Sequence, residues 1–331
     1  MESSLPSPVV FTTPCQLTME WGGTAFRNGQ FDYTTNSKEN SYVKNSQLHI
    51  RPTLQNESLI TTDTVLNLTA MGICTSPLLK NCVAVTNTSS TGIVNPVKSA
   101  RINTRHGASI TYGRVEVRAR LPAGKWLWPA IWMLPVKDTY GPWPASGEID
   151  IAEARGNDWQ YPEGGNDVIS STLHWGPDYA NDAWWRTNVK HRSSHSSYAD
   201  AFHTFGLEWS EKYIFTYVDS RLLQVMYTNF QTPLWERGEF PLTGPNGTRY
   251  IDPWSQTGRK STPFDQPFYL VINVGVGATN GWFENGKDGK PWVDGSPTAA
   301  KDFWQARDEW HQTWKDGGEM VVESVKMWQQ C

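Results

Sequence analysis

Stretches in which polar and apolar residues alternate recur along almost the whole chain. This period of two is typical of β-strands with one buried face, and the stretches are bounded by Gly, Pro, Asn and Asp turns. The predicted strands lie in segments 46–54, 100–107, 112–135, 167–175, 202–210, 212–227, 267–277 and 318–328. Helical periodicity is confined to short pieces such as residues 299–312. The pattern therefore predicts an all-β chain folded as a sandwich of antiparallel sheets.

No Pro-rich or Ser-rich linker divides the predicted strands into blocks. The 331 residues are enough for two domains, but β-sandwiches often exceed about 200 residues as one unit. We therefore predict a single domain over residues 1–331. Long loops are predicted at 52–98, 176–201, 229–266 and 279–300. Two of them contain "YANDAWWRTN" and "ATNGWFENGK", which are rich in Trp, Tyr and Asn and indicate the walls of a binding groove.

Tryptophan is abundant for a chain of this kind. There are 18 Trp although hydrophobic residues make up only 38% of the chain, which indicates exposed rings able to stack on sugars or bases. A net charge of −4, a pI near 6.0 and mixed charges argue against nucleic acid or an anionic membrane as partner. No apolar run approaches the roughly 20 residues of a membrane span. We expect a monomer that binds a polysaccharide.

The cysteines and glycosylation sequons favour an oxidising, secretory route. Cys15, Cys74, Cys82 and Cys331 have no CxxC spacing, which disfavours zinc. Four cysteines allow three pairings, of which we favour Cys74 with Cys82 across a short loop and Cys15 with Cys331 between the termini. N-x-[ST] sequons begin at Asn56, Asn67, Asn87 and Asn246. Three of them within a short span beside two cysteines predict a secreted glycoprotein. Residues 1–11 lack the apolar core of a signal peptide.

Three carboxylates fall within six residues of the stretch "SGEIDIAE", residues 146–153. In a regular strand Glu148 and Asp150 share one face, whereas Glu153 points to the other. A β-bulge adds one residue and reverses the alternation beyond it. A bulge at Ile151 or Ala152 would therefore bring all three carboxylates to one face. Such a group of like charges inside an otherwise apolar strand repels itself and indicates a catalytic role.

Glycosidases catalyse cleavage with two neighbouring carboxyl groups. One glutamate attacks the anomeric carbon as a carboxylate while the other, protonated, assists departure of the leaving oxygen, and neighbouring negative charge raises the pKa of the second. Retaining enzymes hold the groups ~5 to 5.5 Å apart and inverting ones ~6.5 to 9.5 Å apart. Two long Glu side chains that lean toward each other on a curved strand can reach the shorter distance. The sequence nevertheless leaves both retention and inversion open. Carboxylates and water suffice, so no metal or organic cofactor is expected.

Charged and apolar residues also alternate in "YGRVEVRARL", residues 112–121. One face of this strand carries Arg114, Glu116, Arg118 and Arg120. A solvated polar face is one interpretation. The following strand, however, carries Trp126, Trp128 and Trp132 in alternation, and rings beside this ladder of charges would form a concave sugar-binding face. We expect the two strands to place charges and rings together.

These motifs resemble those of a known family. "GEIDIAEARGN", together with residues 112–135 and "FHTFGLEWS", closely resembles glycoside hydrolase family 16, over about residues 97–328. Its members are β-jelly-rolls of two curved antiparallel sheets with a concave substrate cleft, and most are retaining endo-glycosidases. The similarity is greatest to laminarinase-like endo-1,3-β-glucanases and to the related invertebrate β-glucan recognition proteins.

The resemblance implies roles for the acidic motif. Glu148 corresponds to the nucleophile and Glu153 to the acid/base, while Asp150 helps to set protonation. Family motifs with five positions from first to last glutamate are the bulged form, usual in laminarinases, and this chain has five. The resemblance further implies that substrate contacts are made by Trp143, Trp132, Glu116, Arg118, His174 and Trp282. Trp128, which alternates with Trp132 on the same predicted strand, is expected to join them. The "GATNGWF" stretch around Trp282 departs from the family pattern.

The leading hypothesis is a secreted endo-β-1,3-glucanase that hydrolyses laminarin-like chains by double displacement. Transglycosylation uses the same residues and is an alternative, as is activity on 1,3(4)- or 1,6-branched glucans; β-galactans fit less well. A β-glucan-binding protein without catalysis is a further alternative, and the complete set of Glu148, Asp150 and Glu153 argues against it.

Overall fold

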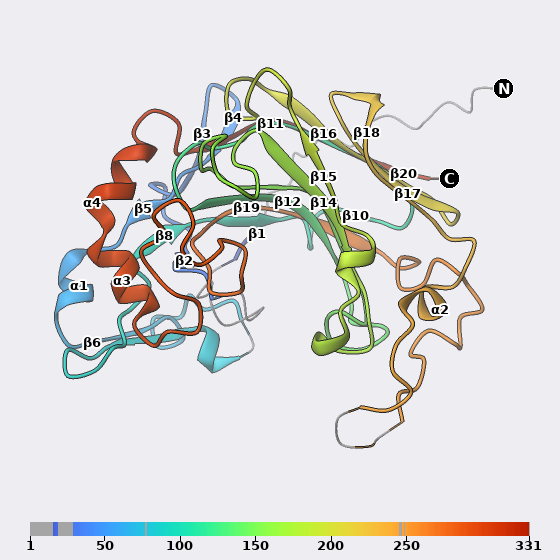
Figure 1. The fold of residues 1–331 in the computed structure, drawn as a ribbon, viewed down its shortest axis with the longest axis horizontal. Coiled ribbons are helices and arrows are strands. Elements are labelled where there is room, and N and C mark those ends of the chain that lie inside the picture. The colour runs from blue at the N-terminus through green and yellow to red at the C-terminus, as the bar shows by residue number, and fades with distance from the viewer. Residues whose placement is uncertain (1–15, 19–28, 77, 245–246, 248, 331) are drawn as a thin grey trace.

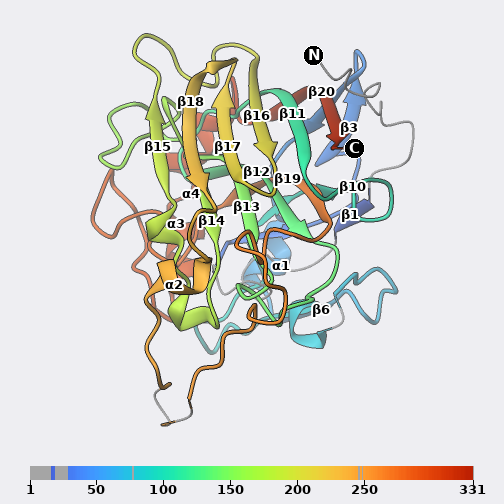
Figure 2. The same cartoon turned by 90° about the vertical axis from the view of Figure 1, so that its right-hand side faces the viewer.

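Two antiparallel β-sheets lie face to face in the computed structural model, which describes residues 16–18, 29–76, 78–244, 247 and 249–330 (Figures 1 and 2). The prediction of an all-β sandwich is confirmed. Each sheet contains strands from both halves of the sequence. The strands predicted at 167–175, 202–210 and 267–277 agree with the observed strands Val168–His174, His203–Trp209 and Phe268–Val276 to within one residue at each end, whereas segment 212–227 divides into two strands. Pairing follows sequence order in only part of each sheet.

The larger sheet has eight strands and carries the candidate site. In spatial order they are β1 (Gln16–Thr18), β9 (Arg101–Asn103), β19 (Phe268–Val276), β12 (Leu127–Pro135), β13 (Glu148–Ala154), β14 (Val168–His174) and β15 (Val189–Arg192), with β10 (Ser109–Ile110) paired to β19. Both faces of β12 and β19 are buried. One face packs on the second sheet, and the other forms the floor of a cleft.

The second sheet has seven strands and backs the first. Its order is β18 (Ser220–Asn229), β17 (Tyr213–Val218), β16 (His203–Trp209), β11 (Gly113–Arg120), β20 (Met320–Gln329), β4 (Gln47–Ile50) and β3 (Ser41–Lys44). From Arg114 to the end of β11 the buried residues alternate with partly exposed ones. This alternation is what a sheet with one face on the core requires.

The segment predicted as a loop at 52–98 instead contains short regular elements. They are β5 (Thr53–Leu54), α1 (Glu57–Thr61), β6 (Thr64–Asn67), η1 (Leu79–Asn81), β7 (Val83–Thr86) and β8 (Val97–Ser99), and β8 also pairs with β2 (Asp32–Thr34). Elsewhere the chain forms η2 (Tyr179–Asn181), η3 (Trp184–Arg186) and α2 (Leu234–Gly238). The predicted helix at 299–312 is broken into α3 (Ala299–Gln305), α4 (Arg307–Trp310) and η4 (His311–Trp314).

The core between the sheets is apolar, with Val117 and Phe205 from one sheet and Ile131 and Ile149 from the other. A cluster of aromatic rings extends it to the end of the molecule where α3 and α4 lie (Figure 1). There Phe303 stacks on Trp310 with ring centroids 4.2 Å apart. Much of the Trp surplus is therefore core packing, since Trp126, Trp175, Trp209, Trp292 and Trp310 are almost fully buried.

One predicted disulfide is confirmed, because Cys74 and Cys82 are bonded. Cys15 and Cys331 lie outside the described residues, as does Asn246. The side chains of Asn56 and Asn87 are exposed and that of Asn67 is partly buried.

Among the described residues, no helix combines the length and the apolar character needed to cross a membrane.

Candidate active site

A β-bulge in β13 gathers the acidic motif on one face. Asp150 pairs with Trp132 of β12 and Ala152 with the preceding Ile131, so Ile151 is the extra residue. The register of β13 against β14 shifts in the same interval. Ile149, Ile151 and Ala152 are buried toward the other sheet, and Glu148 and Glu153 both line the cleft. The predicted bulge is confirmed.

Each glutamate accepts a hydrogen bond from an indole. Trp143 donates from Nε1 to Oε2 of Glu148 over 2.7 Å, and Trp128 donates from Nε1 to Oε1 of Glu153 over 3.0 Å. A fixed indole restricts the rotamer of the carboxyl group that it contacts and favours its ionised form. The two rings therefore position the carboxylates from opposite ends of the motif.

Trp128 belongs to a stack of flat groups. Its ring lies parallel to that of Trp282, with centroids 4.6 Å apart, and the guanidinium of Arg155 lies 4.1 Å from the centroid of the Trp282 ring. Arg155 also donates to the Trp282 carbonyl from Nε over 2.9 Å and from Nη2 over 2.7 Å. Sequence reasoning missed Arg155, although it lies two residues after Glu153. Its position directly behind the motif was the available signal.

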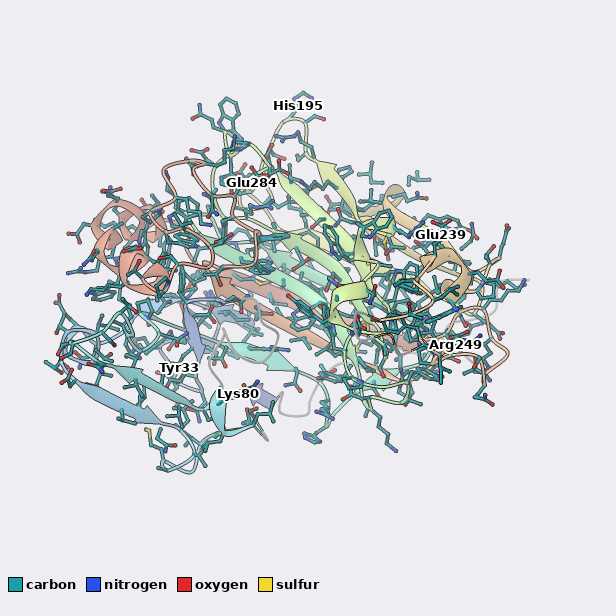
Figure 3. The ribbon with its side chains drawn as sticks, turned by 60° about the horizontal axis from the view of Figure 1, so that its bottom comes forward. Tyr33, Lys80, His195, Glu239, Arg249 and Glu284 are labelled. Carbon is teal, nitrogen blue, oxygen red and sulfur yellow. A yellow bond between two sulfur atoms is a disulfide. The ribbon has the colours of Figure 1, made fainter. Side chains whose placement is uncertain are left out.

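The loop that carries Trp282 is tied down by a buried lysine. Lys290 Nζ donates to the Phe283 carbonyl over 2.7 Å and lies 2.6 Å from an Asp294 carboxylate oxygen. Phe283 and Trp292 anchor the loop in the core. Burying an ammonium group is costly unless it is paired and hydrogen-bonded, and here it is both. The loop thus presents Trp282 in a fixed position. Glu284, which is labelled in Figure 3, lies in the same loop.

His174 connects Asp150 with a second acidic residue. It lies opposite Glu148 on β14, its Nε2 is 3.2 Å from Asp150 Oδ2 and its Nδ1 is 2.6 Å from Asp182 Oδ2. Burial alone would lower the pKa of His174, but the hydrogen bonds to Asp150 and Asp182 raise it well above its usual value. The neighbouring carboxylates therefore favour the protonated form of the imidazole. No pattern around Asp182 pointed to this role.

Burial raises the pKa of all three motif carboxyls. For Glu148 the negative charge of Asp150 adds to the effect of burial, and for Asp150 that of Glu153 does so. Burial raises the pKa of Glu153 to about 7, while the His174 cation opposes the rise and Glu148 adds to it. The group holds a proton near neutral pH, as general acid catalysis requires.

The bulge is supported from below by a chain of buried hydroxyl groups. Ser171 donates to the Ile151 carbonyl over 2.6 Å, Thr216 donates to Ser171 over 2.8 Å, and the Met226 amide donates to Thr216 over 3.1 Å. Ser171 and Thr216 are fully buried. The chain crosses the core from the second sheet to β13, and sequence reasoning missed it.

The cleft around these groups has a volume of about 650 Å³. Seven predicted residues line it, namely Trp128, Trp132, Trp143, Glu148, Glu153, His174 and Trp282. Trp132 donates from Nε1 to Asn273 Oδ1 over 2.7 Å. Tyr179 and Trp184 add rings at the rim, on the loop predicted as a groove wall. The ring centroid of Tyr179 is 5.6 Å from that of Trp143.

The prediction for Glu116 and Arg118 is wrong. Both lie on β11, which pairs with β16 and β20 in the second sheet, whereas β12 is in the first. Because Val115 and Val117 face the core, Glu116 and Arg118 point to the outer face. There Glu116 accepts a hydrogen bond from Tyr217 over 2.8 Å, and Arg118 pairs with Glu323. They form the solvated polar face that was the other interpretation.

Glu148, Asp150 and His174 offer ligand atoms that lie within 4.8 Å of one another. A divalent cation could contact them, but it would occupy the carboxylates that glycoside cleavage uses.

Comparison with known proteins agrees with this geometry. A family model, Glycosyl hydrolases family 16, matches residues 29–248. The chain belongs to this family. The laminarinase of Rhodothermus marinus, a solved structure, is 25% identical with a TM-score of 0.57, covering 98% of this chain and 93% of the other. The jelly-roll form of the sandwich is thereby confirmed.

Family 16 relatives include proteins named for binding and proteins named for cleavage. A β-1,3-glucan-binding protein of Penaeus monodon is 42% identical over 94% of this chain and 83% of that protein. Glucan endo-1,3-β-glucosidase A1 of Niallia circulans is 31% identical over 82% of this chain but 30% of that protein. The chain likewise spans 46% of Gram-negative bacteria-binding protein 1 of Drosophila melanogaster.

Proposed function

We propose that this family 16 chain is a retaining endo-β-1,3-glucanase. The observation that carries the proposal is the bulge, which places Glu148 and Glu153 on one cleft floor with an indole donor on each. Glu148 attacks the anomeric carbon, and Glu153 protonates the departing oxygen. Glu153 then removes a proton from the water that releases the glycosyl-enzyme intermediate.

The division of roles follows the order of the two glutamates in the family motif, because their pKa values do not separate the groups. Burial and the negative charge of Asp150 raise the pKa of Glu148 to about 8, and His174 and the Trp143 indole oppose that rise. Burial raises the pKa of Glu153 to about 7, which suits a group that must be protonated at the start of the cycle.

The substrate assignment rests on the rings and on the relatives. Trp132, Trp143 and Trp282 line the cleft, where aromatic rings can stack on the apolar faces of sugars. Relatives and solved structures are named for β-1,3-glucan or as laminarinases. We propose laminarin-like β-1,3-glucans as the substrate. We further propose that the protein is a secreted, monomeric glycoprotein in which residues 1–331 form one domain. The Cys74–Cys82 disulfide supports an oxidising compartment.

The decisive experiment follows the anomeric configuration of the product. Proton NMR of early laminarin hydrolysis should show the β-anomer first, and the α-anomer first would overturn retention. Parallel digests of lichenan, pustulan and galactan, compared with laminarin, define the linkage. Glu148→Gln should be inactive on all of them, and turnover equal to wild type would refute the mechanism.

Rescue of activity by azide distinguishes the catalytic roles of the two glutamates. In Glu148→Ala, azide can occupy the vacated space and attack the anomeric carbon, and the product is the α-glucosyl azide. In Glu153→Ala, Glu148 still forms the intermediate, and azide then yields the β-glucosyl azide. The reverse pairing of variant and product would exchange the roles.

A second candidate is glucan binding without turnover, which the name of the Penaeus monodon relative favours. The complete carboxylate set argues for catalysis. Isothermal titration with laminari-oligosaccharides, run beside the hydrolysis assay, separates the two: saturable binding with no product would establish the second candidate. Lengthened oligosaccharides would instead indicate transglycosylation.

A further inference from the structure

Arg186 and Arg237 lie together at a pocket outside the cleft. Its volume is about 370 Å³, and it lies between η3, α2 and the end of β18. Arg237, Thr228 and Asn229 are among its lining residues, and Glu239 lies at its rim, labelled in Figure 3 beside the segment that follows α2. None of these residues takes part in the proposed glucanase site.

The two guanidinium groups are poorly compensated. Arg186 Nη2 lies 2.6 Å from Glu239 Oε2, but the Glu239 side chain is 74% exposed, and exposed ion pairs contribute little. Within the described part of the chain, Arg237 has no carboxylate partner; its contact is a hydrogen bond of 3.5 Å to the Arg186 carbonyl. Burial lowers the pKa of Arg237, and the charge of Arg186 lowers it further. The pocket therefore has an excess of positive charge.

Two polar atoms of the pocket residues are buried without a partner. Arg186 Nε and Thr228 Oγ1 each lack a hydrogen bond in the described structure, and the Thr228 residue is 2% exposed. A buried donor without an acceptor costs free energy of about 1–3 kcal/mol. A ligand with several acceptor oxygens would satisfy both and neutralise the charge at the same time.

We propose that this pocket is a binding site for a tetrahedral oxyanion of the sulfate or phosphate class. Arg237 supplies a planar fork of N–H donors that suits two oxygens of such an anion. Arg186 Nε and the Thr228 hydroxyl are the further unpaired donors among the residues that line the pocket. The anion is either free in solution or a sulfate group on a polysaccharide.

The site is connected to the cleft rim. The Arg186 guanidinium lies 4.3 Å from the centroid of the Trp185 ring, and the adjacent Trp184 lines the glucan cleft. An anion that draws Arg186 into the pocket would change the surroundings of the Trp185 ring. Indole fluorescence therefore provides a local signal of occupancy.

Titration with sodium sulfate against sodium chloride at constant ionic strength tests the site. We expect saturable binding to the wild type, weakened at least about tenfold in Arg237→Gln, since hydrogen bonds to charged groups are among the strong ones. Arg221→Gln is the matched control, because Arg221 lies on the same strand β18 but pairs with Glu208 outside the pocket. Circular dichroism confirms that each variant is folded.

Thr228→Val provides a second test if Arg237→Gln does not fold. It removes one hydroxyl from the pocket and should weaken sulfate binding with little change of shape. The fluorescence response should disappear in Trp185→Phe while calorimetric binding remains.

Titration of laminarin and sulfated laminarin identifies the source of the anion. Binding of free sulfate would identify the ligand of the pocket as an anion free in solution. Binding of sulfated laminarin alone, dependent on Arg237 and retained in Glu148→Gln, assigns a polymer-borne group. The proposal would be overturned if neither free sulfate nor sulfated laminarin bound to the protein. It would also be overturned if either bound equally to the wild type and to Arg237→Gln. The outcome is separate from glucanase activity, which is assayed on unsulfated laminarin.

Discussion

The Ser171 hydroxyl donates a 2.6 Å hydrogen bond to the carbonyl of Ile151, the residue without a partner on β12. A bulge leaves backbone groups unpaired, and here a buried side chain from β14 satisfies one of them. Thr216 connects this contact to the second sheet. The position of Glu153 thus depends on a contact made on the opposite, core side of its strand.

Ser171→Ala should impair catalysis beyond its effect on stability. The unsatisfied carbonyl should lower the free energy of unfolding by about 1–3 kcal/mol, and displacement of Glu153 should lower kcat roughly 10- to 100-fold. Urea unfolding and laminarin kinetics measure the two. Ser99→Ala is the control, because Ser99 is buried and donates in the same way to the Val274 carbonyl. An equal loss of kcat in both variants would contradict a role for the bulge.

Trp128→Phe should move the alkaline limb of the pH profile upward. Burial raises the pKa of Glu153 to about 7, and the Trp128 hydrogen bond holds it down. Activity should therefore fall as the pH rises through about 7 in the wild type and at higher pH in the variant. The plot of kcat/KM against pH checks this. Trp132→Phe, whose indole contacts Asn273, should leave the limb in place.

Asp182→Asn should shift both limbs of the same profile upward. Loss of the Asp182 contact lowers the pKa of His174, whose cation lowers those of Glu148 and Glu153. Nitrogen-detected NMR of the imidazole and the kcat/KM profile measure the two steps. Asp219→Asn removes a similar partner from His203 outside the cleft and should leave the profile unchanged. A lower pKa of His174 with unmoved limbs would refute this coupling.

Asp32→Asn should flatten the pH dependence of stability between pH 5 and 7. Burial raises the pKa of Asp32 from 3.8 to about 7, so across this interval the folded state binds a proton that the unfolded state has lost. The contribution of Asp32 to the free energy of unfolding is therefore fully present below about pH 4 and decreases as the pH rises toward 7. Asn keeps the acceptor for the Val276 amide.

Urea unfolding at several pH values tests the Asp32 prediction. Asp63→Asn is the control, since hydrogen bonds with Thr88 lower the pKa of Asp63 and it does not titrate in this range. If the two variants showed the same slope as the wild type, Asp32 would not be the responsible group.

The local pattern of polar and apolar residues was enough to predict the strands, the bulge in β13 and the group of carboxylates at Glu148, Asp150 and Glu153. Alternation fixes which residues of one strand share a face, and the count from Glu148 to Glu153 requires one extra residue if both line the cleft. The Cys74–Cys82 pair followed from short separation. These inferences need only the chain near the residues concerned.

The neighbours of each strand were decided by the tertiary structure. Residues 112–135 correctly indicated two strands, but the chain crosses from one sheet to the other between them, so Glu116 lies across the core from Trp132. Arg155 and Ser171 acquire their roles from contacts with a loop and a strand that are distant in sequence. Asp182 acquires its role because the loop after β14 folds back onto His174. Alternation defines the faces of a strand but not its partners, since pairing is set by how the apolar faces of all strands are buried together.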